Sequence, residues 1–143
     1  MVTNLLENNH LVLVGKVTSD KTYSHEIYGE KFYIFDLEVP RLSKAIDVIP
    51  ITVSERLLTN LNLEIAKKLA VEGQFRSYNS YQNERNKLIL TVFAKDIIEV
   101  VDSEEMQEDE EKKETVTNEV ILSGYVCKKP IYRQTPFGRE IAD

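Results

Sequence analysis

The sequence contains no tryptophan, one cysteine and two histidines among its 143 residues. Cys127 is alone and cannot form a disulfide within the chain, which fits a reducing compartment and predicts a cytoplasmic protein. His10 and His25 stand apart, and there is no Cys-x-x-Cys or His-Glu-x-x-His pattern, so the sequence offers no metal site. It also lacks a Gly-x-x-x-x-Gly-Lys phosphate-binding motif. We therefore expect neither an enzyme nor a cofactor.

Long hydrophobic runs are missing as well. No stretch reaches the roughly 18 apolar residues that span a bilayer, and residues 1–9 lack the basic start and apolar core of a secretory signal. Hydrophobic residues nevertheless make up 42% of the chain, which is enough to fill a core. The length gives one ordinary domain and a remainder, without a membrane segment.

The net charge of −6 is concentrated in one short segment. Residues 1–101 carry 12 basic and 13 acidic side chains, whereas residues 102–117 carry 2 and 8, and residues 118–143 carry 4 and 3. The middle segment is almost free of apolar residues, so it reads as a solvated, extended linker. The parts predicted to fold are close to neutral. The charge therefore neither excludes nor supports binding to nucleic acid.

The chain repeats part of itself on either side of this segment. Residues 9–17, Asn-His-Leu-Val-Leu-Val-Gly-Lys-Val, are echoed by residues 118–126, Asn-Glu-Val-Ile-Leu-Ser-Gly-Tyr-Val. At the same offset of 109, Tyr23 aligns with Tyr132 and Gly29 with Gly138. This match indicates a duplicated domain. We expect a first domain at 1–101, an acidic linker at 102–117 and the truncated start of a second domain at 118–143.

Period-two alternation predicts that the first domain is built of strands. In residues 11–17 the odd positions share one face, and Gly15 indicates a bulge or a sharp bend. Further strands are predicted over 33–39, 45–53, 69–75 and 87–101. Because proline lacks a backbone N–H, Pro50 predicts that the end of the 45–53 strand lies at a sheet edge or at a bulge. Residues 79–86 read as a polar loop.

One short helix is predicted after Ser54, a capping residue, between the third and fourth strands. Three strands, a short helix and two strands are the layout of an all-β, five-stranded OB-fold barrel. The face and loops of this fold bind oligonucleotides or oligosaccharides. Residues 118–143 would supply only the opening strands of a second OB-fold.

The residues at 9–17, Gly29 before an alternating strand, and residues 71–76 (Val-Glu-Gly-Gln-Phe-Arg) before a loop resemble the bacterial single-stranded DNA-binding protein family. The resemblance spans about residues 9–101. Residues 127–138, Cys-Lys-Lys-Pro-Ile-Tyr-Arg-Gln-Thr-Pro-Phe-Gly, are similar to the family's first loop and turn. Such a tandem resembles a divergent two-domain relative. It implies single-stranded DNA binding in replication, repair or recombination, with replication or repair proteins as partners.

The chain departs from the family at the stacking residues. The family stacks bases on tryptophans in its second and third strands and in the loop between strands four and five, and this chain has none. The third-strand position falls near Ile46 or Asp47. Stacking is worth about 1–3 kcal/mol per base, so losing two or three platforms implies much weaker binding.

Aromatic rings interleaved with cations are what binding to any single strand requires, because rings stack on bases and cations neutralise phosphates. The end of the fourth strand and the next loop carry such a set, and the alternative is that its tyrosines pack locally. The first loop and the neighbouring strands carry a second set, in which a ring can equally anchor the loop. The candidate binding residues are Arg76, Tyr78, Tyr81, Arg85 and Lys87, together with Lys16, Tyr23, Tyr28, Lys31, Phe32, Arg41 and Lys44.

The predicted function is non-catalytic binding of single-stranded DNA by base stacking and phosphate neutralisation. The residues do not distinguish DNA from RNA. The alternative is an OB-fold module for oligomerisation or protein docking that has lost most of its own DNA binding. It is suggested by the first strand, which is apolar on both faces and predicts a homo-oligomer or pairing within the chain. Residues 118–143 should either be disordered or lend their strand to an exposed sheet edge.

Overall fold

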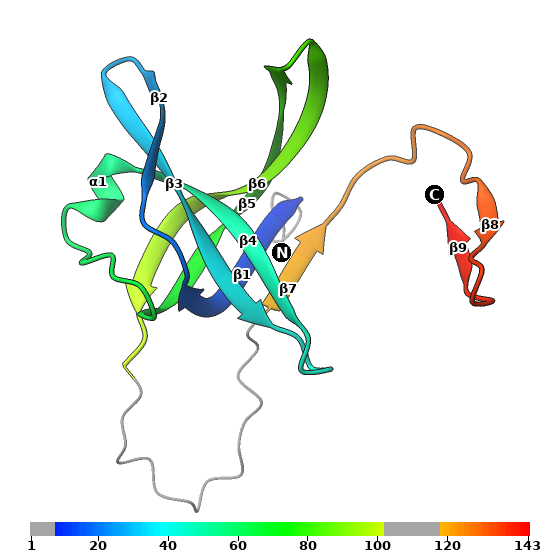
Figure 1. Cartoon of the computed structure of the whole chain (residues 1–143), viewed down its shortest axis with the longest axis horizontal. Coiled ribbons are helices and arrows are strands. Elements are labelled where there is room, and N and C mark those ends of the chain that lie inside the picture. Colours follow the sequence, from blue (N-terminus) through cyan, green and yellow to red (C-terminus); the bar gives the residue numbers. More distant parts are fainter. Residues whose placement is uncertain (1–7, 102–117) are drawn as a thin grey trace, which may run out of the picture.

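The computed structural model describes residues 8–101 and 118–143, so the predicted linker at 102–117 lies outside the described residues. The elements are β1 (Asn9–Val17), β2 (Thr22–Ile27), β3 (Glu30–Pro40), β4 (Ile46–Ser54), α1 (Glu55–Leu58), β5 (Lys68–Gln82), β6 (Arg85–Glu99), β7 (Asn118–Leu122), β8 (Tyr132–Gln134) and β9 (Glu140–Ala142) (Figure 1). Within the described ranges, no helix is long and apolar enough to cross a membrane.

Five strands of the first repeat pair in a closed cycle. β1 pairs with β3, β3 with β4, β4 with β6, β6 with β5, and β5 returns to β1. All these pairings are antiparallel except the short parallel contact between β4 and β6. The helix α1 follows β4, and the Ser54 side chain caps it by accepting a hydrogen bond from the backbone N–H of Arg56. The predicted five-stranded OB-fold barrel with one short helix is confirmed.

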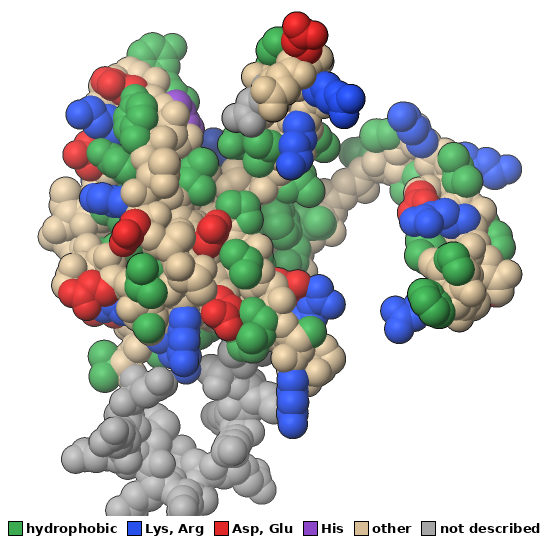
Figure 2. Space-filling model, viewed as in Figure 1, with side chains coloured by type: hydrophobic (Ala, Val, Ile, Leu, Met, Phe, Trp, Pro, Cys, Tyr) green, Lys and Arg blue, Asp and Glu red, His purple; other side chains and the backbone are tan. Residues whose placement is uncertain are grey.

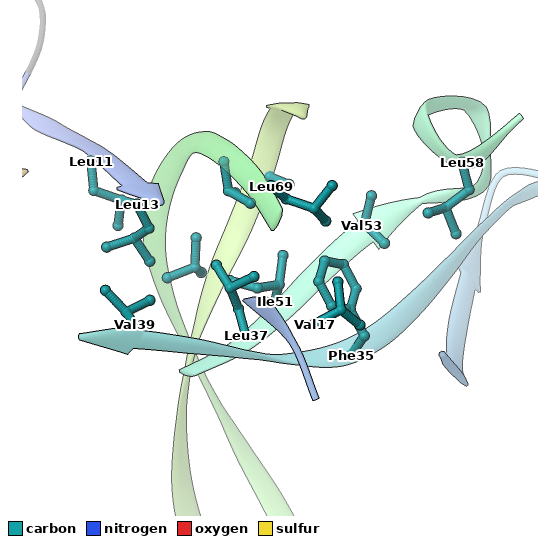
Figure 3. Close-up of a cluster of buried hydrophobic side chains, with 13 residues drawn as sticks. Leu11, Leu13, Val17, Phe35, Leu37, Val39, Ile51, Val53, Leu58 and Leu69 are labelled. Atoms are coloured by element: carbon teal, nitrogen blue, oxygen red, sulfur yellow. The ribbon is translucent and has the colours of Figure 1, made fainter. Parts of the chain in front are cut away.

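The barrel interior is filled by the odd positions of β1 and by matching positions of the other strands (Figure 3). Alternation along each strand sends every second side chain into this core. The fully buried side chains include Leu13, Phe35, Leu37, Ile51 and Val71. Burial of each such side chain contributes about 1.5–3 kcal/mol. This core holds the outer face of the same strands in register.

Two glycines mark places where strands cross too closely for any side chain. A Cβ added at Gly15 would lie 2.2 Å from the backbone oxygen of Glu38, and one at Gly73 would lie 2.1 Å from that of Phe93. The ladder of β1 with β5 runs through Gly15 without a shift, so this glycine serves a close approach and not a bulge. The bulge lies at Gly73, between Glu72 and Gly73 in the β5–β6 ladder.

The prediction of a polar loop at 79–86 is wrong. β5 and β6 continue as a paired ribbon to a two-residue turn at Asn83 and Glu84, which both have positive φ angles of 52° and 62°. Such turns match the twist of a hairpin. Polar residues occupy this ribbon because it projects beyond the barrel. The first loop also contains a strand that was not predicted, β2, which pairs with β3. Figure 1 shows both hairpins extending from the same side of the barrel.

Pro50 lies within the third predicted strand, at a point where β4 has a partner on one side alone. β4 runs through it to Ser54, and Pro50 faces Asp36 of β3. On its other side the contact with β6 begins only at Ile51. The missing N–H of proline therefore interrupts no ladder there.

The described part of the second repeat forms β7 and a separate β8–β9 hairpin (Figure 1). β7 adds to the sheet by pairing with the N-terminal half of β1, so the expectation that this segment lends its strand to a sheet edge is confirmed within the chain. In the hairpin, Tyr132 faces Ala142, as Tyr23 faces Tyr33 at an offset of 109. The two hairpins thus share this pair, but the β2–β3 ladder shifts its register between Tyr23 and His25, whereas the β8–β9 ladder continues without a shift.

Candidate nucleic-acid interface

The outer face of the barrel, opposite the core, is formed by the even positions of β3 and β4 and by the positions that pair with them across β6 and β5. The pairs are Ile34 with Thr52, Thr52 with Phe93, and Phe93 with Gln74. Because alternation is unbroken from Gln74 to Gln82, the side chains of Arg76 and Tyr78 belong to this outer face.

Aromatic and cationic side chains follow one another across this face. The His25 ring stacks on Phe32 with centroids 4.8 Å apart and an interplanar angle of 11°. The Phe32 ring lies 5.7 Å from that of Phe93, and the guanidinium carbon of Arg76 lies 3.8 Å from the Phe93 ring centroid. That distance is well within the range of a cation–π interaction. Tyr78 is the next outer-face residue of β5 after Arg76.

Small side chains on β4 allow the two phenylalanine rings to meet. Thr52 and Ser54 are buried between β3 and β6. The hydroxyls of Thr52 and Thr91 are 2.8 Å apart, and Thr91 also donates to the carbonyl of Pro50 at 3.1 Å. Ser54 donates to the carboxylate of Glu30. Buried hydroxyls without partners would be costly, so these bonds explain how polar residues are held beneath the rings.

The strip continues onto the β5–β6 ribbon. The cross-strand pairs Arg76↔Thr91, Tyr78↔Ile89 and Ser80↔Lys87 all lie on the outer face, and Arg85 follows Lys87 on the same side. We call this set the outer strip, and it consists of His25, Phe32, Phe93, Arg76, Tyr78, Lys87 and Arg85. It combines rings with cations along one line, as a path for a single strand requires. The Phe32 ring is buried, with 6% of the residue exposed, so the rings that a base can reach are those of His25, Phe93 and Tyr78.

Tyr81 lies apart from the other residues of its predicted group. Its odd position places it on the opposite face of the ribbon from Tyr78, facing Asn86. Both rings are exposed, Tyr78 by 44% and Tyr81 by 69%. One straight strand of nucleic acid therefore cannot stack on both rings from the same side.

Two shallow hollows adjoin the outer strip at α1. One, of about 290 Å³, is lined by Phe32, Phe93, Arg56 and Lys95 among others. The other, of about 530 Å³, is lined by Tyr28 and Lys31 together with Glu30 and Arg56, which belong to both hollows. The predicted residues Tyr28 and Lys31 thus lie beside the strip, but Lys31 faces Glu26 across the hairpin, which reduces its local positive charge.

Four predicted residues lie away from the strip. Tyr23 packs edge-on against Tyr33, with centroids 5.9 Å apart. This arrangement agrees with the alternative reading of Tyr23 as a loop anchor. The exposed Lys16 lies on β1, where it faces Glu38. Lys44 is an exposed turn residue with a φ of 69°.

Arg41, the fourth of these residues, already pairs with a carboxylate of its own chain. Its Nε donates to a carboxylate oxygen of Asp47 at 2.7 Å, and its second nitrogen bonds the other oxygen. This pairing lowers the pKa of the Asp47 carboxyl and raises that of Arg41. A guanidinium held by two bonds to its own carboxylate is less available for a phosphate.

Sequence reasoning named neither Phe93 nor His25 as a candidate binding residue. His25 lies in β2 with its ring on Phe32. The signal for Phe93 was present: in the run Thr91-Val92-Phe93-Ala94 the neighbours Val92 and Ala94 are core residues, so period two sends Phe93 outward. It was not used because the register between β4 and β6 is not visible in the sequence.

The charge around the strip is mixed. Asp36 and Glu38 share the outer side of β3 with Phe32, and Figure 2 shows acidic and basic side chains interspersed over the barrel. Binding by charge alone is therefore weak on this face, and the rings must contribute. Among residues 8–101 and 118–143, no group of three or more His, Cys, Asp or Glu side chains is placed to hold a metal ion.

Comparison with solved structures finds several similar proteins. The N-terminal domain of the PriB protein from Thermoanaerobacter tencongensis, whose structure is dimeric, is 55% identical, with a TM-score of 0.58 over 66% of this chain and 99% of that domain. The Plasmodium falciparum SSB in complex with ssDNA is 20% identical, with a TM-score of 0.54 over 65% of this chain and 95% of that one.

A deletion mutant of the single-stranded DNA-binding protein from Thermus aquaticus is 19% identical, with a TM-score of 0.60. The match covers 94% of this chain and 65% of that one. These two similarities below 25% identity establish the shared fold. No family model matches this sequence. A search of curated proteins also gives no match.

Proposed function

This chain belongs to the OB-fold family of single-stranded DNA-binding proteins that includes the PriB N-terminal domain, and from that membership we propose that it binds single-stranded DNA along the outer strip. The strand would lie across β3, β4, β6 and β5 and leave along the β5–β6 ribbon. The role is non-catalytic and belongs to replication, repair or recombination in the cytoplasm. The observation that carries the proposal is the contact series from His25 through Phe32 and Phe93 to Arg76.

The strip supplies two kinds of interaction. Rings offer faces to any base, at about 1–3 kcal/mol per base, whereas Lys87 and Arg85 are exposed cations that neutralise phosphates. In the free protein Arg76 covers one face of Phe93. A base that stacks there would displace the guanidinium, which is then free to reach a phosphate. The absence of tryptophan is thus offset by phenylalanine, tyrosine and histidine.

The test is a titration of fluorescently labelled oligo-dT by fluorescence anisotropy at low and high salt. We expect affinity to fall as salt rises, because cations released from the DNA take part in the equilibrium. Binding no tighter than millimolar at low salt, or binding indifferent to salt, would refute the proposal. Oligo-U of the same length shows whether the strip distinguishes DNA from RNA.

The variant Phe93→Leu tests whether DNA binds at the outer strip. It keeps an apolar side chain but removes the ring, and we expect a loss of about 5- to 100-fold in affinity, the effect of one stacked base. The matched control is Phe137→Leu, which removes an exposed ring from the turn between β8 and β9. If the two variants bound oligo-dT with equal affinity, the binding site would have to lie outside the outer strip.

For the domain organisation we keep the predicted division into 1–101, 102–117 and 118–143, with the last part opening a second OB-fold. It is supported by the shared pairing of Tyr132 and Tyr23 in the two hairpins. A structural match over 94% of the chain must also extend beyond residue 117. We further propose that copies of this chain associate through β1 and that replication or repair proteins are among its partners.

A further inference from the structure

The smaller of the two hollows beside the outer strip forms where four elements meet. Its lining combines rings, one carboxylate and two cations, and it includes Glu30 and Phe32 of β3, Ser54 of β4, Arg56 of α1, and Phe93 and Lys95 of β6. Its volume of about 290 Å³ is close to the lower end of the range for small-molecule sites, roughly 300 Å³. The hollow therefore suits one base and not a longer piece of a strand.

One wall of this hollow is apolar. The rings of Phe32 and Phe93 lie 5.7 Å apart at an angle of 42°, and Leu57 and Ala94 continue the wall on either side. Phe93 is partly exposed, so it offers ring surface that the plane of a base can cover. Such a wall accepts every base, and any choice between bases must come from the polar side chains.

The carboxylate of Glu30 is the acceptor in the hollow. The hydroxyl of the buried Ser54 donates to its Oε1, which holds the carboxylate against β4. A carboxylate accepts at about four lone-pair positions, so one bond leaves room for a ligand. A phosphate is repelled by this charge, whereas the N–H groups of a base are attracted to it. Glu30 therefore suits an edge of a base and not the backbone of the strand.

The two cations have no carboxylate of their own. Among residues 8–101 and 118–143, neither Arg56 nor Lys95 forms an ion pair. The bulge in the β5–β6 ladder determines the position of Lys95: Ala94 faces Gly73 and Asp96 faces Glu72, so Lys95 is the extra residue between them. Bulges redirect side chains in this way. Both cations are thus able to donate to an acceptor in the hollow.

We propose that this hollow selects guanine from the bases of a bound strand. Guanine is the base with two neighbouring donors on one edge, N1–H and the N2 amino group, and its O6 next to them is an acceptor. Glu30 accepts from the two donors, and Arg56 or Lys95 donates to O6. Adenine and cytosine present one donor beside an acceptor, and thymine presents one N–H between two carbonyl oxygens. This selectivity rests on the proposed path of the strand along the outer strip.

The experiment compares oligo-dT with the same oligonucleotide in which one central thymidine is replaced by deoxyguanosine, deoxyadenosine or deoxyinosine. Fluorescence anisotropy measures each affinity for the full chain. We expect deoxyguanosine to increase the affinity by at least about fivefold, the lower end of what a bidentate pair gives, because the hollow is open to solvent. Deoxyadenosine tests stacking of a purine alone and should give a smaller increase. Deoxyinosine lacks the N2 amino group and should lose part of the gain.

The variant Glu30→Gln tests which residue reads the base. It keeps an oxygen that accepts from Ser54 but replaces the other oxygen by an amide donor. We expect the affinity ratio between the deoxyguanosine oligonucleotide and oligo-dT to fall to about one. Glu26→Gln is the matched control, because Glu26 is an exposed residue of the neighbouring strand β2 and does not line the hollow. It makes the same change of charge and should leave the ratio as in the wild type.

The outcomes separate this selectivity from DNA binding itself. If oligo-dT binds with the expected salt dependence but deoxyguanosine gives no more than deoxyadenosine, the guanine site is refuted and the proposed function stands. A guanine preference that survives Glu30→Gln, or that Glu26→Gln removes equally, would also refute the site. If no oligonucleotide binds, the proposed function fails, and the guanine site fails with it.

Discussion

The two repeats of this chain have the same local sequence pattern but very different surroundings. Leu13 of β1 is 1% exposed, whereas its counterpart Leu122 in β7 is 65% exposed. Both strands form, and both hairpins contain the equivalent pair, Tyr23 with Tyr33 and Tyr132 with Ala142. Strand formation is therefore encoded locally, while burial in the first repeat depends on β4, β5 and β6, which come from later in the chain.

The repeats also differ at the candidate site. The stacked pair His25 and Phe32 is replaced in the second repeat by Gln134 and Ile141. The described part of the second repeat therefore does not reproduce the start of the outer strip. This difference favours the first repeat as the DNA-binding part and weakens the alternative that it is only a docking module.

The largest contrast is expected from removing equivalent core and exposed leucines. Leu13→Ala should lower the free energy of unfolding by about 2–5 kcal/mol, because it opens a cavity in the core. Leu122→Ala should change it by less than about 0.5 kcal/mol, because that side chain is largely solvated. Urea unfolding of both variants measures this, and similar losses would mean that β7 is part of the barrel core.

A glycine pair gives the next contrast. Gly15→Ala forces a methyl group against the backbone of Glu38, and overpacking of this kind destabilises by about 1–3 kcal/mol. Gly124, the counterpart, has no atom within 4 Å of an added Cβ, so Gly124→Ala should be neutral or slightly stabilising. Thermal unfolding checks both, and a tolerated Gly15→Ala would contradict the close crossing of β1 and β3.

Variants of two arginines, one in each repeat, test which repeat binds DNA. Arg76→Gln should weaken oligo-dT binding several-fold and reduce the salt slope by about 0.7, the value for one phosphate contact on a single strand. Arg133, on the β8–β9 hairpin, is paired with Asp143, and Arg133→Gln should leave both quantities unchanged. If only Arg133→Gln changed the salt slope, the DNA-binding site would have to lie in the second repeat.

The smallest expected effect is a change in the pKa of a tyrosine in the β8–β9 hairpin. The hydrogen bond from Tyr132 to Glu140, with a lesser contribution from desolvation, raises the pKa of the Tyr132 hydroxyl. The protonated hydroxyl is the bonded form, so this bond stabilises the hairpin below the ordinary tyrosine pKa and is lost as pH rises through the raised value. NMR titration should show a lower Tyr132 pKa in Glu140→Gln, and an unchanged pKa would mean that the bond is absent in solution.

Most of the barrel could be predicted from the sequence because alternation in β1, β3 and β5 is a local property. The ribbon at 79–86 could not, since its polar residues look like a loop until the partner strand is known. Phe93 was missed for a related reason: its neighbours Phe32 and Thr52 on the outer face come from strands β3 and β4, more than 35 residues away. Arg76 and Tyr78 were found because they lie next to a core pattern on their own strand.

The parallel contact between β4 and β6 consists of only two residue pairs, Ile51↔Val92 and Thr52↔Phe93. It joins segments some 40 residues apart, and contacts of this range form slowly because the loop between them must first be ordered. Phe32 and Phe93 meet only after this closure. Oligonucleotide binding should consequently appear later during refolding than the helix and the hairpins, so ligand affinity serves as a kinetic probe of the closure between β4 and β6.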